Sequence, residues 1–214
     1  MTGSNVSDTS SGLWLAVIVS GIYHGLNPAM GWPLAVSAGL MERSNRAFAG
    51  ALAALSFGHF VAMLAVLLPF AALAVLSDWQ REIRISAALL VIAFGLYRLL
   101  DRRHPRALAR IPPSQLGLWS FAVAIAHGAA LMLVPIYLGL CSATAGTASA
   151  SIEMAGWVAL AHSAAMLAAG GLIAFIVYRT LGLSAIAKTW FNLDVVWALS
   201  LVGVGAASLA ATLL

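Results

Sequence analysis

Charged residues and cysteine are both scarce in this sequence. Of its 214 residues only 8% are charged, and Cys141 is the single cysteine. One cysteine excludes an intramolecular disulfide and a redox relay built on a cysteine pair. A soluble domain carries about one quarter charged residues. A chain with 8% charged and 62% hydrophobic residues is therefore predicted to be an integral membrane protein.

Several functional motifs are also missing. The chain has no Ser/His/Asp or Cys/His set suited to a hydrolase, no phosphate-binding glycine loop and no nucleic-acid motif. Neither an enzyme nor a nucleic-acid partner is expected. The first twelve residues are polar, include Asp8 and lack the basic leader of a secretory signal peptide. We therefore expect the first apolar run to remain in the mature protein.

Apolar segments long enough to cross a bilayer recur six times along the chain. They cover residues 13–41, 47–77, 83–100, 116–141, 153–178 and 193–214. The length leaves room for six spans of about 20 residues with short loops, and for no separate soluble domain. The sequence predicts an all-α membrane protein with six transmembrane helices in a single transmembrane domain, residues 1–214.

Positive charges are concentrated on alternate loops. If the N-terminus faces outward, the outer loops hold only Arg81 and Arg84. The inner loops and helix ends then hold Arg43, Arg46, Arg98, Arg102, Arg103, Arg106, Arg110, Arg179 and Lys188. Because cytoplasmic loops carry an excess of Lys and Arg, both termini are expected on the outer, periplasmic side of a bacterial-type inner membrane.

An internal repeat is the strongest signal in the sequence. His24-Gly25 recurs as His127-Gly128, and His59 recurs as His162, both at an offset of 103 residues. The heptapeptides HFVAMLA at 59–65 and HSAAMLA at 162–168 are identical at five of seven places. The basic, proline-containing loop at about 101–115 separates repeat one, about 13–100, from repeat two, about 116–214.

Each repeat contains three predicted helices, so the second repeat must enter the membrane from the opposite side. The two halves are then inverted three-helix repeats, related by a pseudo-twofold axis in the membrane plane. Secondary transporters commonly have this architecture, with the substrate site at the interface of the repeats. The sequence therefore favours a transporter.

Prolines are expected to break helices one and four. The segment YHGLNPAMGWP, residues 23–33, places Pro28 and Pro33 inside the first apolar run, and Pro135 lies in the fourth. Proline removes a backbone donor and kinks or unwinds a helix. Irregular backbone at membrane depth is tolerated where it lines a cavity or is buried in protein, and the alternative interpretation is a kink used only for packing.

Four histidines near the middle of their spans form the candidate site. Imidazole is a common ligand of divalent transition metals, and His24, His59, His127 and His162 are the predicted ligands. Thioethers favour softer ions such as nickel, cobalt, zinc or copper, and Met30, Met63 and Met166 are predicted secondary ligands. Asn27 could orient His24, offer a carbonyl ligand or serve only as a kink residue.

Other interpretations of these residues stay open. A single membrane histidine is more often a hydrogen-bonding group between helices, and methionine more often fills gaps in a core. Four imidazoles could instead bind haem axially in a membrane electron carrier. Histidines could also couple protons to the transport of a small organic solute.

The stretch of residues 23–28, YHGLNP, resembles the histidine-plus-proline motif in the first helix of the LysE-type transporter superfamily. Its nickel/cobalt efflux permeases and hydrogenase/urease accessory permeases are similar in this motif. The resemblance implies two inverted three-helix halves and metal-ion transport. The expected partners are the lipid bilayer and a small inorganic ion or small solute, with a homo-oligomer possible and no tightly bound cofactor.

Overall fold

The computed structural model describes residues 3–73, 79–100, 111–143, 147–181 and 193–213. These residues are nearly all helical, and none of them forms a strand. The all-α prediction is confirmed for this part of the chain. Most of the basic loop, residues 101–110, and Lys188 lie outside the described residues.

The first apolar run forms two α-helices separated by a short 3₁₀ turn. Helix α1 covers Gly3–Leu26, the turn η1 covers Pro28–Met30, and α2 covers Trp32–Met41. The second and third runs form α3 over Asn45–Leu73 and α4 over Gln80–Leu100. The predicted break in the first run is confirmed, between Leu26 and Trp32.

The described residues of the second half of the chain are also helical. After the 3₁₀ turn η3 at Pro113–Gln115, α5 covers Leu116–His127 and α6 covers Ala129–Ala143. Helix α7 follows over Ala148–Ile176, a π-helical turn η4 over Val177–Leu181, and α8 over Leu193–Leu213. Helices α5 and α6 are bent by 67° at the residue between them.

The break in the fourth run was predicted at the wrong residue. Pro135 lies inside α6, whereas the chain bends at Gly128. Gly128 has φ +70°, a left-handed conformation that glycine adopts without steric cost. The Phe94 ring occupies the space that a side chain at Gly128 would need. A glycine, and not a proline, therefore breaks the helix formed by the fourth apolar run, between α5 and α6.

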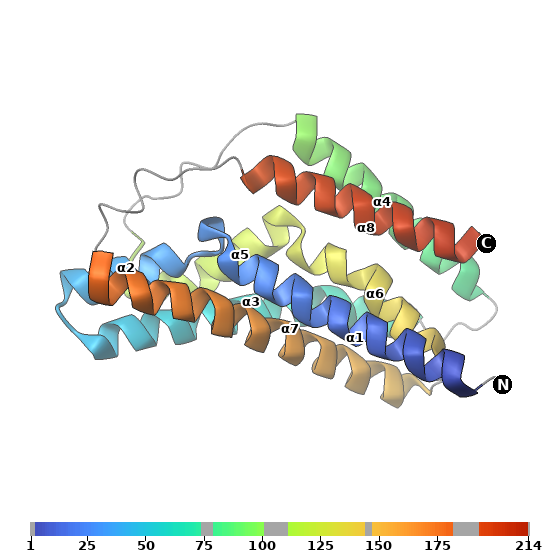
Figure 1. The fold of residues 1–214 in the computed structure, drawn as a ribbon, viewed down its shortest axis with the longest axis horizontal. Helices are drawn as coiled ribbons and strands as arrows, with labels where there is room; N and C mark the ends of the chain where they lie inside the picture. The colour runs from blue at the N-terminus through green and yellow to red at the C-terminus, as the bar shows by residue number, and fades with distance from the viewer. Residues whose placement is uncertain (1–2, 74–78, 101–110, 144–146, 182–192, 214) are drawn as a thin grey trace.

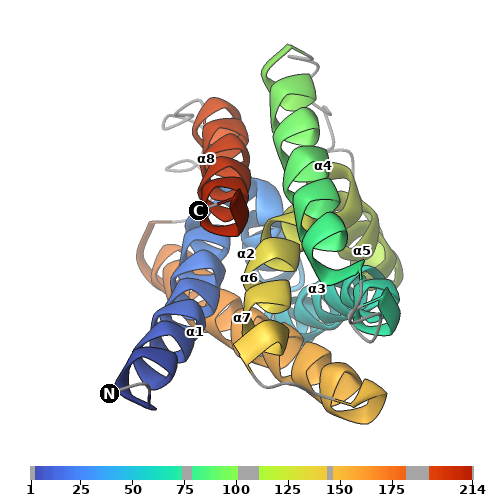
Figure 2. The same cartoon turned by 90° about the vertical axis from the view of Figure 1, so that its right-hand side faces the viewer.

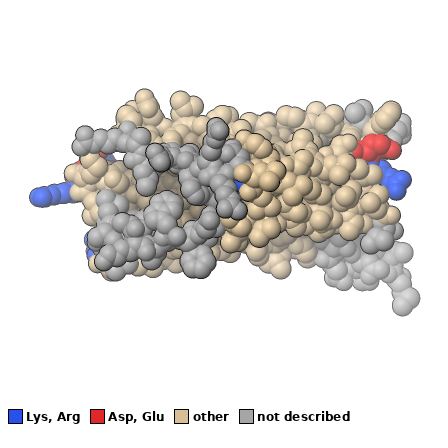
Figure 3. Space-filling model, turned by 90° about the horizontal axis from the view of Figure 1, so that it is seen from above, with Lys and Arg blue, Asp and Glu red and all other residues tan. Residues whose placement is uncertain are grey.

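The described helices are consistent with a multi-pass membrane protein. Four of them, in α3, α4, α7 and α8, are long and apolar enough to cross a membrane, and the bent α5–α6 pair makes a fifth if it is counted as one span. The apolar parts of the first run, Ser10–Leu26 and Trp32–Met41, are each shorter. On the face seen in Figure 3, most of the charged side chains lie toward the two ends, and the described surface between them is almost all uncharged.

The helices form an elongated bundle with both chain termini at one end (Figure 1). We call this the terminal end, and the opposite end, where Arg43, Arg46 and Arg179 lie, the arginine end. Helix α1 packs along α7, α3 contacts both α5 and α7, and α4 packs along α8. Figure 2 shows α6 at the centre of the bundle, where it contacts all the other long helices.

Two glycines allow α1 to approach α7 closely. A side chain on Gly21 would collide with the carbonyl of His162, and one on Gly25 with the carbonyl of Met166. Small residues four positions apart permit such close backbone approach between membrane helices. This contact fixes the end of α1, and with it His24, against the middle of α7.

Candidate functional site

Three of the four predicted histidines meet in the middle of the bundle. His24 lies in the last turn of α1, whereas His59 and His162 each lie fourteen residues from both ends of their helices, α3 (45–73) and α7 (148–176). The ring centroids are 4.8 Å apart for His24 and His162, 5.5 Å for His59 and His162, and 5.7 Å for His24 and His59. We call these three side chains the histidine trio.

The trio is buried and largely without hydrogen-bond partners. His24 and His59 are 1% exposed and His162 is 0% exposed. Neither Nε2 of His24, nor Nε2 of His59, nor either ring nitrogen of His162 has a hydrogen-bond partner. Most buried polar groups in folded proteins are hydrogen-bonded. Four unpartnered nitrogens in one cluster therefore point to a ligand that the cluster takes up.

One hydrogen bond sets the tautomer of His24. Its Nδ1 lies 3.0 Å from the carbonyl oxygen of Ser20. Because a carbonyl can only accept, the neutral ring carries its proton on Nδ1, and the unpartnered Nε2 holds a free lone pair. His127 makes the equivalent bond to the carbonyl of Val123, at 3.1 Å. The two histidines that precede the helix breaks thus share one local arrangement.

The fourth predicted ligand, His127, is not a member of the trio. It is the last residue of α5 and is 5% exposed. Its backbone carbonyl accepts a hydrogen bond of 2.8 Å from Nε1 of Trp197 on α8. The Trp197 ring in turn meets the His24 ring, with centroids 4.2 Å apart. The structure therefore joins His127 to the trio through Trp197.

The side chain of Asn27 stabilises the helix break. Among the described residues, it forms no hydrogen bond with His24. Its Oδ1 accepts from the backbone N–H of Ala29 at 3.0 Å, which caps the 3₁₀ turn. Gly31, with φ +101°, completes the turn through a bond from its N–H to the Pro28 carbonyl. Of the interpretations considered for Asn27, the structure supports the kink residue.

The predicted methionines are all buried, on two sides of the trio. Met63 follows His59 by one turn on α3, and Met166 follows His162 by one turn on α7. The two helices run in opposite directions (Figure 1). Met63 therefore lies toward the terminal end, whereas Met166 and, beyond the first break, Met30 lie toward the arginine end.

Trp197, Ser20 and Ser163 were not predicted as site residues from the sequence. Trp197 is 2% exposed and has its ring against both Tyr23 and His24. Ser20 and Ser163, each adjacent along a helix to a trio residue, carry buried hydroxyl oxygens without a partner. Trp197 has no equivalent in the first repeat at the offset of 103, where Phe94 stands, so the repeat gave no signal for it.

The trio is not a formed metal site in this structure. Among the described residues, no group of three or more His, Cys, Asp or Glu side chains is arranged to hold a metal ion. The trio consists of neighbouring imidazoles whose donor atoms are not gathered around one point. Side-chain rotation would be needed before all three could bind one ion.

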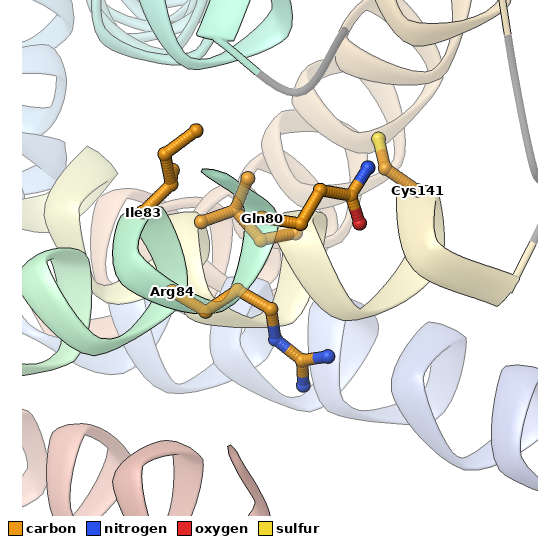
Figure 4. A pocket seen from close by; sticks show the side chains of 5 residues that line it. Gln80, Ile83, Arg84 and Cys141 are labelled. Atoms are coloured by element: carbon orange, nitrogen blue, oxygen red, sulfur yellow. The ribbon is translucent and has the colours of Figure 1, made fainter. Parts of the chain in front are cut away.

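A small cavity also lies near the terminal end. Gln80, Ile83, Arg84, Leu138 and Cys141 line it, and its volume is about 10 Å³. Figure 4 shows the Gln80 amide directed toward the Cys141 thiol and the Arg84 guanidinium directed away from it. Such a volume holds about one water molecule, which is too small for a substrate site.

Comparison with known proteins gives no family for this chain. No protein-family model, curated protein or solved structure matches it significantly. The function is therefore inferred from the residues and their geometry.

Proposed function

We propose that this protein is a secondary transporter of a transition-metal ion, with the histidine trio as its central binding site. The observation that carries the proposal is the meeting of three buried imidazoles from three helices, with four ring nitrogens unpartnered. Ionisable residues in the middle of membrane spans are costly and mark ion or substrate pathways. In this proposal the ion is the transported substrate and not a resident cofactor.

The spacing of the trio suits one ion. Imidazole nitrogens bind zinc at about 2.0–2.1 Å, so three imidazoles around a tetrahedral ion have ring centroids about 5 Å apart. The observed separations of 4.8–5.7 Å are close to this value. Rotation of the rings, without movement of the helices, would therefore bring the nitrogens toward a common centre.

The hydrogen bond of His24 also supports a ligand role. Histidines that bind metals usually donate their other ring N–H to a carboxylate, a backbone carbonyl or water, which fixes the tautomer. His24 has this arrangement through the Ser20 carbonyl, and its Nε2 is free. His127 has it through the Val123 carbonyl, so His127 remains the proposed ligand of a second conformation of the transporter.

The methionines give the proposed path soft ligands on both sides of the trio. Met63 and Met132 lie toward the terminal end, and Met30 and Met166 toward the arginine end (Figure 1). Thioether sulfur with imidazole favours copper(I), zinc, nickel or cobalt over magnesium or calcium. An ion that leaves the trio would therefore meet a further weak ligand in either direction.

We further propose six membrane spans in two inverted repeats, as in the LysE-type permeases that the sequence resembles. The helix contacts support this arrangement, because α1 packs on α7 as its counterpart α5 packs on α3, while α4 packs on α8. Both breaks directly follow a histidine-containing helix end. The proposed location is a bacterial-type inner membrane, with the terminal end outside.

The rival functions fit the trio less well. A haem held by two of these histidines would need its porphyrin plane between the two rings, yet the rings are already within 5.7 Å of one another. A small organic solute would need donors and acceptors for its polar groups. Beside the imidazoles, the described residues around the trio offer the hydroxyls of Ser20 and Ser163 and otherwise mainly apolar side chains, and no carboxylate or basic side chain is among them.

The test is metal binding and transport by the purified protein. Wild type in detergent is titrated with zinc, nickel, cobalt and copper(I), and bound metal is measured by elemental analysis. Proteoliposomes then report transport of the ion that binds. We expect about one ion per chain, lost in His162→Ala. The control is His104→Ala, which removes a histidine from the basic loop outside the described residues and should bind normally.

Two results would contradict the proposal. If wild type binds none of the four metals, the trio is not a metal-ion site. A Soret band in the absorption spectrum would then favour haem instead. Equal metal content in wild type and His162→Ala would place any bound metal outside the trio.

A further inference from the structure

A second polar site lies at the arginine end, away from the histidine trio. An open groove of about 370 Å³ separates the end of α2 from the end of α7, and its lining residues are Gly39, Leu40, Arg43, Tyr178 and Arg179. No step of the proposed transport uses these residues. Two guanidinium groups thus line one groove.

An unusual backbone conformation places Arg43 in this groove. Arg43 has φ +49° and is the one non-glycine residue with positive φ in the described part of the chain. The N–H of Ser44 bonds to the carbonyl of Gly39 at 3.0 Å, which closes the end of α2 at a position that usually holds glycine. The left-handed conformation is unfavourable for an arginine, because its Cβ crowds the backbone. Backbone strain of this kind is found preferentially at functional sites.

The opposite wall also departs from regular helix. Helix α7 passes into the π-helical turn Val177–Leu181, which carries Tyr178 and Arg179. Single π-helical turns occur frequently at functional sites. The wall is fixed in place, because the Tyr178 ring stacks on Phe48 with centroids 4.7 Å apart and its hydroxyl donates to Oδ1 of Asn45 at 3.0 Å.

Gly39 lets the two walls meet. A side chain there would come within 2.8 Å of both the Phe48 side chain and the Tyr178 ring. Neither group is the end of a flexible chain that could move aside easily. The groove therefore depends on a tight contact between α2, α3 and the end of α7.

Among the described residues, no protein group neutralises the charges of the two arginines. Neither Arg43 nor Arg179 forms an ion pair with any described residue, and Arg179 has instead the Phe175 ring at 5.9 Å from its guanidinium carbon. None of the described residues that line the groove is a carboxylate, although the exposed Glu42 precedes Arg43. Two like charges that share a groove repel each other, and an anion between them would remove this repulsion.

We propose that this groove binds a phosphate group, and that its source is the headgroup of an anionic phospholipid. Guanidinium groups match the geometry of phosphate oxygens, and basic pockets between helices on the cytoplasmic side bind such headgroups. The groove adjoins the apolar surface of the molecule, where Met41, Phe175 and Ile176 are exposed. A lipid bound at the groove would have its acyl chains along these side chains, whereas a soluble phosphate ester would gain nothing from them.

The experiment measures lipid binding by full-length protein in detergent. The thermal unfolding midpoint is recorded against increasing phosphatidylglycerol, with phosphatidylcholine and inorganic phosphate as separate arms. Wild type is compared with Arg43→Gly/Arg179→Gln and with the control Arg46→Gln, which removes a charge from the same end but outside the groove. Arg43→Gly suits the left-handed position, so loss of binding in that variant cannot result from a damaged turn.

We expect phosphatidylglycerol to raise the midpoint of wild type and control alike. In the groove variant its apparent affinity should be about tenfold weaker or more, since each arginine contributes a charge-assisted hydrogen bond. Phosphatidylcholine and inorganic phosphate should have little effect. A response to inorganic phosphate alone, lost in the groove variant, would replace the lipid by a soluble phosphate ester. An equal response to phosphatidylglycerol in wild type and groove variant would overturn the proposal.

Discussion

The imidazole of His24 and the indole of Trp197 lie edge to face, with ring centroids 4.2 Å apart and an angle of 71° between their planes. Tyr23 stacks on the same indole at 5.6 Å, and the indole N–H donates to the carbonyl of His127. Trp197 thus contacts the residues that precede both helix breaks. Through this one side chain, helix α8 contacts both the trio and the residue before the bend at Gly128.

Replacement of Trp197 by Phe should weaken both stability and metal binding. The variant keeps an aromatic ring beside His24 but loses the buried hydrogen bond to the His127 carbonyl, so a loss of about 1–2 kcal/mol is expected. Thermal unfolding and metal titration measure the two effects. Trp157→Phe is the matched control, because Trp157 is 54% exposed and bonds only Glu153 on its own helix. If the two variants behave identically, Trp197 contributes neither to stability nor to metal binding at the site.

Single alanine variants should distinguish a site of three histidines from a site of four. His24→Ala, His59→Ala and His162→Ala should each abolish stoichiometric metal binding, because each removes one ligand of the trio. His127→Ala should keep measurable binding, since the ring of that residue is not among the three that meet in the trio and its backbone carbonyl contacts Trp197 beside His24. Elemental analysis of the four purified variants tests this. Equal loss in all four would show that His127 is a primary ligand.

Much of the helix plan could be predicted from the sequence, because membrane spans depend on local composition. The six apolar runs coincide with the described helices to within a few residues, except where the structure extends them. The first break could be predicted because Pro28 and Pro33 act locally. The second could not be placed, since a proline is tolerated within α6 while the bend depends on the backbone freedom of Gly128 and on Phe94 from another helix.

The candidate site could be predicted only in part, for a similar reason. The offset of 103 residues identified the histidines but carried no information on helix rotation. His59 and His162 occupy equivalent positions and meet, whereas His24 and His127 are equivalent in sequence and only His24 reaches the trio. Trp197 contacts His24 and His127 because helices that are distant in sequence pack together. No periodicity or motif in the sequence records such a contact.

Gly25→Ala should destabilise the protein strongly. Its new methyl group would collide with the carbonyl of Met166 and lie 2.8 Å from the N–H nitrogen of Gly170, so α1 and α7 would have to separate. Overpacking of this kind costs about 1–3 kcal/mol. Gly50→Ala is the control, because a side chain there meets nothing within 4 Å and alanine favours a helix. Chemical or thermal unfolding should show a lower stability for Gly25→Ala and an unchanged or higher stability for Gly50→Ala. Equal stability would mean that the close contact of α1 with α7 is not needed.

The two methionines that follow the trio histidines should affect metal preference differently from the histidines themselves. Met63→Leu and Met166→Leu conserve volume, and such replacements usually cost less than about 1.5 kcal/mol, so the fold should persist. A thioether contributes to binding of soft ions far more than of borderline ones. Copper(I) affinity should therefore fall in both variants while zinc affinity changes little, as measured by competition with a chromogenic chelator.

Transport should then distinguish Met63 from Met166. Met63 lies between the trio and the terminal end, and Met166 between the trio and the arginine end. In proteoliposomes of known orientation, loss of the thioether should slow copper(I) loading most from the side on which that methionine lies, because an ion from that side loses its intermediate ligand. Met154→Leu, farther along α7 toward the terminal end and only partly buried, serves as the control. Equal slowing from both sides in both variants would indicate that these methionines act as packing residues, since a packing defect does not depend on the side from which the ion enters.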